Sequence, residues 1–239
     1  MCGIAGIYGR KEKVRREDLE VMGERLAHRG PDGQGVWIDE ADNIGFVHRR
    51  LSIIDLSDNG RQPMHYAGGR YTITFNGEIY NYLEIRKSLT AKGYSFHSAS
   101  DTEVLLALYA DKGRECLYEL DGMFAFAIWD AVKKELFLVR DRFGEKPLYY
   151  ALIDGAFCFA SEMKALFAIG ASMATDPGRI YKYLQSNVLI DEEDTGSTFY
   201  AAIRQLDSAD YMVVQNGEVK KTAKYWSLAG VEEIGRAHV

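Results

Sequence analysis

The chain has 239 residues, of which 47% are hydrophobic, 27% are charged and 12% are aromatic, and its net charge is −6 at pH 7. This length is enough for a sizeable core, and the negative charge argues against a general affinity for nucleic acid or anionic membranes. The sequence lacks an apolar run of the ~20 residues that a membrane span needs, and its first segment does not read as a signal peptide. Three widely spaced cysteines do not make a disulfide framework. We therefore expect a cytoplasmic protein that has neither nucleic acid nor a membrane as a partner.

The first elements follow from glycine content and apolar spacing. GIAGIYG (3–9) predicts a buried, glycine-rich strand, and REDLEVMGERLAHRG (16–30) predicts a helix with apolar residues three and four apart. YTITF (71–75) alternates between apolar and polar residues and predicts a half-buried strand that runs into NGEIYN (76–81).

The next strong element is a helix within SASDTEVLLALYADKG (98–113). Ser100 and Glu103 have the spacing of a capping box, and Gly113 follows the last turn. An acid in the first turn, such as Asp101, is favoured by the helix dipole.

The rest of the chain predicts β-structure. Apolar segments separated by short turns follow one another, and the pairs Asp154-Gly155 and Asn216-Gly217 suit tight hairpins. Strands joined by short turns form mainly antiparallel sheets, which helices cover as separate layers. The predicted class is therefore α+β. The segments are MFAFAIWD (123–130), ELFLVRD (135–141), PLYYALID (147–154), AFCFAS (156–161) and YMVVQNGEVKK (211–221).

A cysteine stands directly after the initiator methionine. Removal of Met1 would leave the thiol of Cys2 and a free α-amine on one residue, and the amine has an unperturbed pKa of about 7.7–8.0. One residue would then carry both a nucleophile and its general base. The alternative interpretation is a small apolar residue packed in the first strand.

Three other positions suit acyl transfer to a thiol, and each has a plainer interpretation. Arg50, next to an apolar strand, is either a counter-charge for a carboxylate or part of a solvated edge. Asn76 and Gly77 are either two donors for an oxyanion or a β-turn, since Asn-Gly is a common turn dipeptide. Asp101 is either a binding group for an ammonium or the helix-start acid described above.

Other motifs point to no further chemistry. The five histidines lack metal-ligand spacing, so we expect no metal site, and the chain lacks the glycine-rich loops of nucleotide sites. Cys116 and Cys158 lie in apolar segments and are expected to be inert. The charges of DRFGEKPLYY (141–150) serve either chemistry or a buried structural network.

The motifs together closely resemble the glutaminase domain of asparagine synthetase B, a class II glutamine amidotransferase of the N-terminal nucleophile hydrolase superfamily. The resemblance runs from Cys2 to about Trp226, and it implies a four-layer αββα sandwich of two antiparallel sheets. The motifs that carry it are MCGIAGIYG, HRGPDG, HRRLSIID, NGEIYN, SDTEV, GMFAFAIWD, RDRFGEKPLYY and FASEMKAL.

The resemblance also implies catalytic roles. Cys2 is expected to attack the side-chain amide of L-glutamine with help from its own α-amine, and to form a glutamyl thioester that water cleaves. Asn76 and Gly77 match the positions of the oxyanion hole.

The resemblance further implies how the substrate is held. Arg50 matches the residue that binds the α-carboxylate of glutamine, and Ile53 and Ile54 match backbone contacts. Glu78 and Asp101 match the acids that receive the α-ammonium group.

The resemblance places the amidotransferase domain at residues 2–226 and a linker start at 227–239, with the synthetase domain absent. That missing C-terminal domain is the expected partner in cis and the expected site of ATP and Mg. No cofactor is therefore expected in this chain. A homodimer is the possible assembly. The parent is expected to be a glutamine-hydrolysing asparagine synthetase. The alternatives are an amidotransferase of similar layout in surface polysaccharide or secondary metabolism, or an inactive regulatory domain.

The last residues, EIGRAHV (233–239), match one reading frame of a widely used sequencing adapter. We therefore expect a non-native tail that is exposed and makes few contacts with the core. The alternative is a short natural surface tail.

Overall fold

The computed structural model describes residues 1–9, 13–191 and 193–230. Two six-stranded antiparallel sheets make up the centre of the fold. Sheet A has the order β10-β8-β9-β1-β3-β2, and sheet B has the order β12-β11-β7-β6-β5-β4. The strands of sheet A are β1 (Gly3–Tyr8), β2 (Gly33–Asp39), β3 (Ile44–Arg50), β8 (Tyr149–Ile153), β9 (Ala156–Ala160) and β10 (Arg204–Gln205). Those of sheet B are β4 (Met64–Tyr66), β5 (Tyr71–Ile79), β6 (Gly122–Asp130), β7 (Glu135–Arg140), β11 (Asp210–Gln215) and β12 (Glu218–Lys224).

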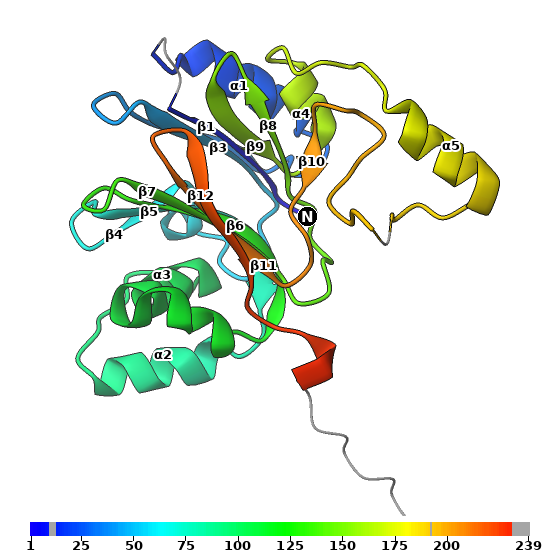
Figure 1. The fold of residues 1–239 in the computed structure, drawn as a ribbon. Helices are drawn as coiled ribbons and strands as arrows, with labels where there is room; N and C mark the ends of the chain where they lie inside the picture. Colours follow the sequence, from blue (N-terminus) through cyan, green and yellow to red (C-terminus); the bar gives the residue numbers. More distant parts are fainter. Residues whose placement is uncertain (10–12, 192, 231–239) are drawn as a thin grey trace, which may run out of the picture.

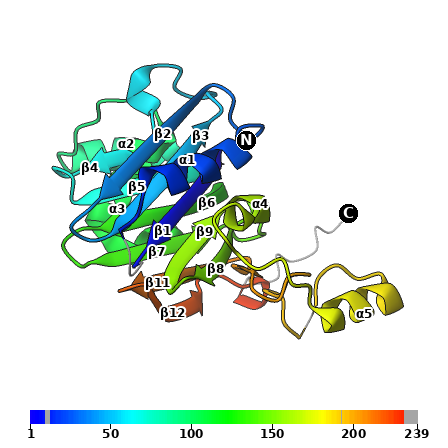
Figure 2. The same cartoon turned by 90° about the horizontal axis from the view of Figure 1, so that it is seen from above.

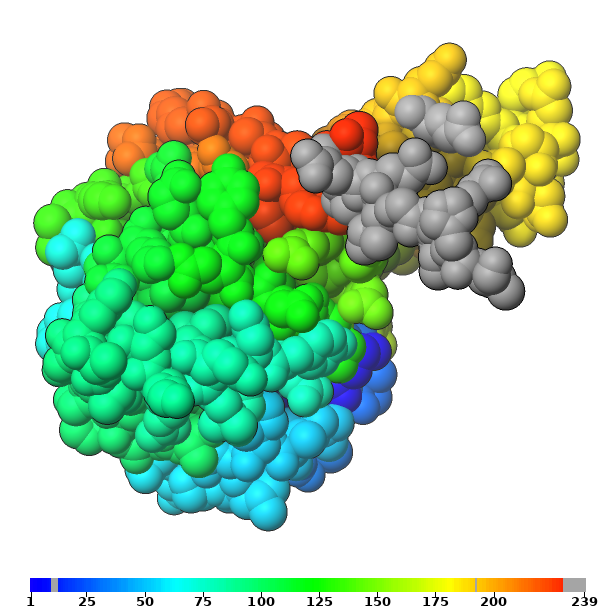
Figure 3. All heavy atoms as spheres, turned by 90° about the horizontal axis from the view of Figure 1, so that it is seen from below, coloured from blue at the N-terminus to red at the C-terminus, as the bar shows by residue number. Residues whose placement is uncertain are grey.

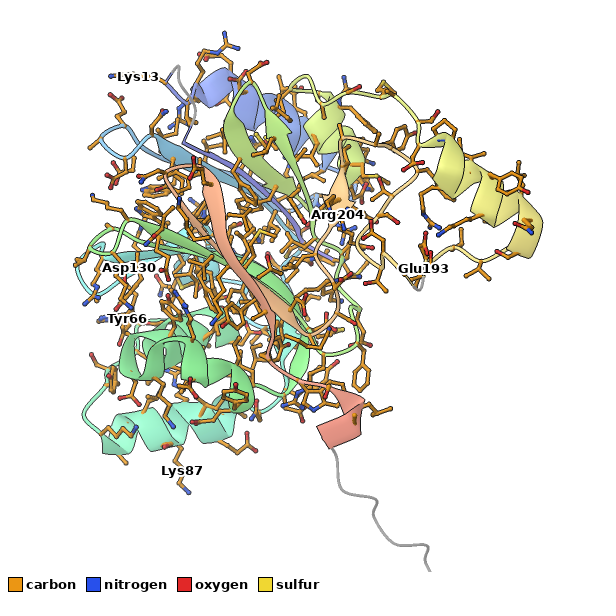
Figure 4. The ribbon with its side chains drawn as sticks, viewed as in Figure 1. Lys13, Tyr66, Lys87, Asp130, Glu193 and Arg204 are labelled. Carbon is orange, nitrogen blue, oxygen red and sulfur yellow. The ribbon has the colours of Figure 1, made fainter. Side chains whose placement is uncertain are left out.

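Helices cover the outer face of each sheet. α1 and α4 lie over sheet A, and α2 and α3 lie under sheet B (Figure 1). Figure 2 shows α5 extending away from the sandwich, and in Figure 3 the segment around it bulges from the body. Arg204 of β10 pairs with Asp194 and so ties the segment that follows α5 to sheet A (Figure 4). The helices are α1 (Arg16–Arg25), α2 (Tyr82–Ala91), α3 (Asp101–Lys112), α4 (Met163–Phe167) and α5 (Pro177–Ser186), with 3₁₀ turns at Asp58–Gly60, Gly113–Tyr118 and Leu228–Gly230.

Three apolar layers correspond to these four layers of structure. One lies between α1, α4 and sheet A, one lies between the two sheets, and one lies between sheet B and α2 and α3. β1 contributes to two of them, because Ile4 faces sheet B while Ala5 and Ile7 face the helices. At Gly6 a Cβ would lie 2.5 Å from the ring of Phe159, so only glycine fits between the sheets there. The predicted αββα sandwich is confirmed.

The structure changes the interpretation of two local signals. Asn76 and Gly77 do not form a turn: they lie inside β5, paired with Ala125 and Phe124 of β6. The strand therefore continues four residues beyond the alternating segment 71–75, because pairing with β6 outweighs the turn preference of Asn-Gly.

The predicted capping box is only half right. Ser100 is the N-cap of α3, and its hydroxyl accepts a hydrogen bond from Thr102 N (3.1 Å). Glu103 does not reach back to Ser100, however, but accepts hydrogen bonds from the backbone of His97 and Ser98. Its carboxylate therefore fixes the loop that enters the helix.

Other sequence expectations are met or fall outside the description. Asp154-Gly155 and Asn216-Gly217 have the positive φ angles of tight hairpin turns. No helix in the described part of the chain is long and apolar enough to cross a membrane. The tail predicted at 233–239 lies outside the described residues.

Candidate active site

Strand register places Cys2 beside the end of β3. β1 and β3 are antiparallel with Gly3 opposite Arg49, so Cys2 comes next to Arg50 and Leu51. Leu51 N lies 3.4 Å from the Cys2 sulfur, and the sulfur lies 3.6 Å from Leu51 O. Burial raises the pKa of the Cys2 thiol, and the hydrogen bond from Leu51 N and the charge of the N-terminus oppose this only in part. The resting thiol is therefore protonated and needs a base to become a nucleophile.

The main chain of Cys2 is fixed by two residues to which the sequence analysis gave no role. Arg29 Nε donates to Cys2 O (2.9 Å), and Arg29 Nη1 donates to Glu162 (2.8 Å). Burial acts to raise the pKa of Glu162, but hydrogen bonds from Arg29, Lys164 and His28 outweigh it and hold that pKa at about 2. Glu162 is therefore ionised at any physiological pH, and the clamp on Cys2 does not titrate there.

A pocket of about 100 Å³ opens at this end of the sandwich. Every residue predicted for catalysis or substrate binding lines it. Cys2, Arg50, Ile53 and Ile54 come from the sheet A side, Asn76, Gly77 and Glu78 come from β5, and Asp101 comes from the start of α3.

Asn76 brings an unpaired donor into this pocket. Its side chain is 1% exposed, and its Nδ2 atom has no hydrogen-bond partner among the described residues. A buried amide without a partner costs roughly 1–3 kcal/mol of stability, so its presence points to a ligand group that completes it.

Gly77 brings a second donor, from the main chain. Phe124 lies opposite Gly77. Its N–H donates to the Asp141 carboxylate and its C=O accepts from Asp141 N, so both groups point toward β7. The pair Gly77–Phe124 is therefore not hydrogen-bonded, and the Gly77 N–H points away from β6. A Cβ at Gly77 would overlap the carbonyl oxygen of Met123, so glycine is required here by the packing against β6.

Phe75 confirms the direction in which the Gly77 N–H points. It lies two residues before Gly77 on β5, so its main-chain groups point to the same side of the strand. Its N–H donates to Gln62 Oε1 (2.6 Å), and its C=O lies 3.1 Å from His48 Nε2. Burial lowers the pKa of His48 to about 4, so the imidazole is neutral, and its Nδ1 has no partner among the described residues. Gln62 and His48 were not predicted, and they hold β5 in place just before the two donors.

Arg50 is held so that its charge stays available. Within the described residues its hydrogen bonds go to main-chain carbonyls, those of Ser57 (2.9 Å) and Asp55. Gly60 leaves room for the guanidinium, since a Cβ there would lie 2.6 Å from Arg50 Nη2. Carbonyls orient the cation without neutralising it, so Arg50 can receive a carboxylate.

Asp101 is a buried carboxylate that has no ion pair with a cation in the described part of the chain. It is 4% exposed, and Oδ2 accepts a hydrogen bond from Ile79 N (3.0 Å). Burial raises its pKa to about 6, and the nearby charge of Glu78 acts in the same direction. A positively charged group placed beside these two acids would favour their ionised forms.

The charges of 141–150 form a structural network. Asp141 is fully buried and accepts hydrogen bonds from four backbone N–H groups, including those of Glu145 and Lys146 (both 2.9 Å). Arg140 donates to the carbonyls of Gly144, Lys146 and Leu206. The network fixes a loop at the pocket wall, where Lys146 points to the N-terminus.

The remaining candidates carry no chemistry of this kind. Cys116 and Cys158 are buried, and burial raises the pKa of Cys116. In the part of the chain that the structure describes, no three His, Cys, Asp or Glu side chains gather as they would around a metal ion.

Comparisons with known proteins agree with this geometry. The model of the glutamine amidotransferase domain matches residues 1–226. Asparagine synthetase [glutamine-hydrolyzing] 1 and 2 of Bacillus subtilis are 45% and 38% identical to this chain, over 77% and 97% of it, but only 29% and 31% of their own length is covered. Amidase chry2 of Gibberella zeae is 34% identical over 95% of the chain and 34% of its own length. The chain thus spans about a third of these relatives.

Solved structures share the fold. The glutamine phosphoribosylpyrophosphate amidotransferase of B. subtilis, in complex with ADP and GMP, superposes with a TM-score of 0.69. The match covers 94% of this chain and 49% of the other, at 18% sequence identity.

Replacement of Asp101 by Asn should stabilise the empty protein at pH 7. Burial raises the pKa of Asp101 from 3.8 to about 6 in the folded protein. Between these pH values the folded protein therefore binds the proton more strongly than the unfolded chain does. The stability of the wild type therefore falls as pH rises from about 4 to 6. Asn does not titrate, so the free energy of unfolding of the variant should exceed that of the wild type by about 1–2 kcal/mol at pH 7, and by less at pH 4. Urea titrations at both pH values measure this; an equal difference at both would contradict it.

Proposed function

The chain belongs to the glutamine amidotransferase domain family, and from this premise we propose that Cys2 hydrolyses L-glutamine to glutamate and ammonia once Met1 has been removed. The observation that carries the proposal is a pair of donors in the pocket that holds a thiol one residue from the N-terminus: Asn76 Nδ2, which has no partner among the described residues, and the Gly77 N–H, which points away from β6. Two such donors beside a nucleophile are what an acyl-transfer transition state requires.

The first half-reaction forms a thioester. The Cys2 sulfur attacks the side-chain carbonyl carbon of glutamine, and its proton passes to the α-amine of Cys2. The carbonyl oxygen becomes an oxyanion, which the donors of Asn76 and Gly77 stabilise. When the C–N bond breaks, the leaving amide nitrogen takes the proton from the protonated α-amine of Cys2 and departs as ammonia.

The second half-reaction restores the enzyme. The neutral α-amine takes a proton from water as the water oxygen attacks the thioester carbon. The same two donors hold the second oxyanion, and the C–S bond breaks. The sulfur recovers the proton, and glutamate leaves.

Substrate binding uses the charges around the pocket. We propose that Arg50 binds the α-carboxylate of glutamine and that Asp101 and Glu78 receive its α-ammonium group. The backbone of Ile53 and Ile54 lines the same pocket and completes the contacts. A free amino acid therefore matches the pocket at both charged ends.

The parent protein is proposed to be a glutamine-hydrolysing asparagine synthetase, since the chain covers only about a third of such relatives. The rest of that protein would bind ATP and Mg; this sequence has no phosphate-binding loop, and no step above uses them. The likeness to an amidase keeps a different acceptor as the alternative. An inactive regulatory domain would not need the unpaired Asn76 donor. The cysteines are few and widely spaced in the sequence, which supports a reducing cytoplasm as its location.

Release of glutamate from glutamine by the protein lacking Met1 tests the proposal. Cys2→Ala should abolish this release and leave the melting temperature nearly unchanged, because only the sulfur is lost. A population that retains Met1, identified by intact mass, should be inactive, since the Cys2 nitrogen is then an amide without basicity. Full activity of either form would exclude the proposed nucleophile and base.

Asn76→Ala and Arg50→Ala should differ in their kinetics. Loss of one oxyanion donor should lower kcat by roughly 10²–10³ with a small effect on KM. Loss of Arg50 should act mainly on KM, because an unpaired buried charge costs about 2–5 kcal/mol in binding. Steady-state kinetics separate the two, and a pure KM effect in both variants would remove Asn76 from the oxyanion hole.

The genomic DNA after the codon for Gly230 tests the proposed parent. An open reading frame that continues to an SGG-(F/L)-DS motif is the expected result. A stop codon directly after Val239 would contradict it.

A further inference from the structure

Lys146 is a buried cation in the catalytic pocket that the reaction above does not use. It is 5% exposed and lines the same pocket as Cys2. Its Nζ donates to the sulfur of Met1 (3.2 Å), and the described residues provide no carboxylate at ion-pair distance from it. A thioether is a weak acceptor, so this ammonium lacks the partner that a buried charge normally has.

The loop around Lys146 is rigid. Asp141 accepts a hydrogen bond from Lys146 N, and Arg140 donates to Lys146 O (both 2.9 Å). The side chain therefore extends from a fixed backbone at the pocket wall.

Removal of Met1 changes what the ammonium faces. The Met1 sulfur that Nζ contacts is five bonds from the Cys2 nitrogen, and it leaves with Met1. Lys146 and Cys2 line the same small pocket.

Resting on the proposed function, we propose that Lys146 keeps the α-amine of Cys2 in its neutral, basic form at physiological pH. Two cations in one small, partly buried pocket repel each other, so the one that can release its proton more easily does so. The α-amine is that group, since its unperturbed pKa of about 7.7–8.0 lies well below the 10.4 of a lysine. Lys146 acts through the amine and does not touch the reacting atoms.

The other cations around Cys2 differ in their availability. Arg29, which holds Cys2 O, is neutralised by Glu162. Arg50 acts on Cys2 in the empty pocket, since its charge lowers the pKa of the thiol, and a substrate carboxylate bound to Arg50 would cancel that charge. His48 is neutral, since burial lowers its pKa to about 4.

The acids on the opposite wall work against it. Asp101 and Glu78 would favour a charged amine, and the substrate ammonium compensates them only when it is bound. Asp55 is turned to Ser57 and Ala99. Lys146 is therefore the cation that would still offset Asp101 and Glu78 at the amine when a substrate carboxylate neutralises Arg50.

The pH profile of kcat/KM tests the proposal. In Lys146→Met the acidic limb should move up by about one pH unit, with about a tenfold loss at pH 7 that recovers near pH 9. Lys146→Arg should keep the wild-type limb, because it retains the charge. Lys87→Met, which removes an exposed lysine on α2 (Figure 4), is the matched control and should behave as the wild type.

A direct titration separates this proposal from the proposed function. In Cys2→Ala, which begins with a free α-amine after processing, the pH dependence of α-amine acetylation gives the amine pKa without turnover. Adding Lys146→Met should raise that pKa by about one unit. If the wild type released no glutamate, the proposed function would fail, while this titration would still decide the role of Lys146.

Two results would overturn the proposal. One is an unchanged amine titration; the other is a loss of activity that is the same at every pH, which would indicate a structural role. If Lys146→Met does not fold, Lys146→Gln serves in its place, since it keeps a polar group without the charge.

Discussion

The pairing of β1 with β3 is the constraint on which the site depends. Because Gly3 lies opposite Arg49, the residue before β1 and the residue that ends β3 meet at one end of sheet A. Sheet B packs against this pair with the end of β5 opposite, so Cys2, Arg50 and Asn76 surround one pocket. A slip of one residue would turn every side chain of β1 to the other face and would place a side chain between the sheets where only Gly6 fits.

The fold leaves several polar groups of the pocket without a hydrogen-bond or charge partner among the described residues. Among the described residues, Asn76 Nδ2 has no partner, Asp101 is a buried carboxylate without a cation, and Arg50 donates its hydrogen bonds to main-chain carbonyls. Each costs stability in the empty protein, and the same groups gain partners when a substrate with matching charges binds. Asp141 and Glu162, by contrast, have their hydrogen bonds, and they fix the backbone on which the incomplete groups stand.

Local signals made much of the fold predictable. β1, α1, α3 and the hairpins of the second half have apolar spacing or turn residues that work without distant contacts. α2 buries only Ile85 and Leu89, which is too weak a pattern to distinguish from a loop. The site residues came from the resemblance, because the residues alone allowed a turn at Asn76. The supporting contacts were beyond reach, since Arg29 and Glu162 are 133 residues apart and meet only in the folded sheet.

Charge complementarity explains why the pocket would select a free amino acid. With Arg50 and Asp101 at separate positions, glutamine would neutralise both through its own carboxylate and ammonium. A glutamine residue inside a peptide has neither charge, so its binding would leave the half-buried cation of Arg50 and the buried carboxylate of Asp101 unpaired. Each unpaired charge costs about 2–5 kcal/mol, enough to exclude peptides even where their side chain could reach Cys2. Specificity for a free amino acid would then come from the charges that the empty pocket leaves unpaired. The thiol itself would not need to distinguish one amide from another.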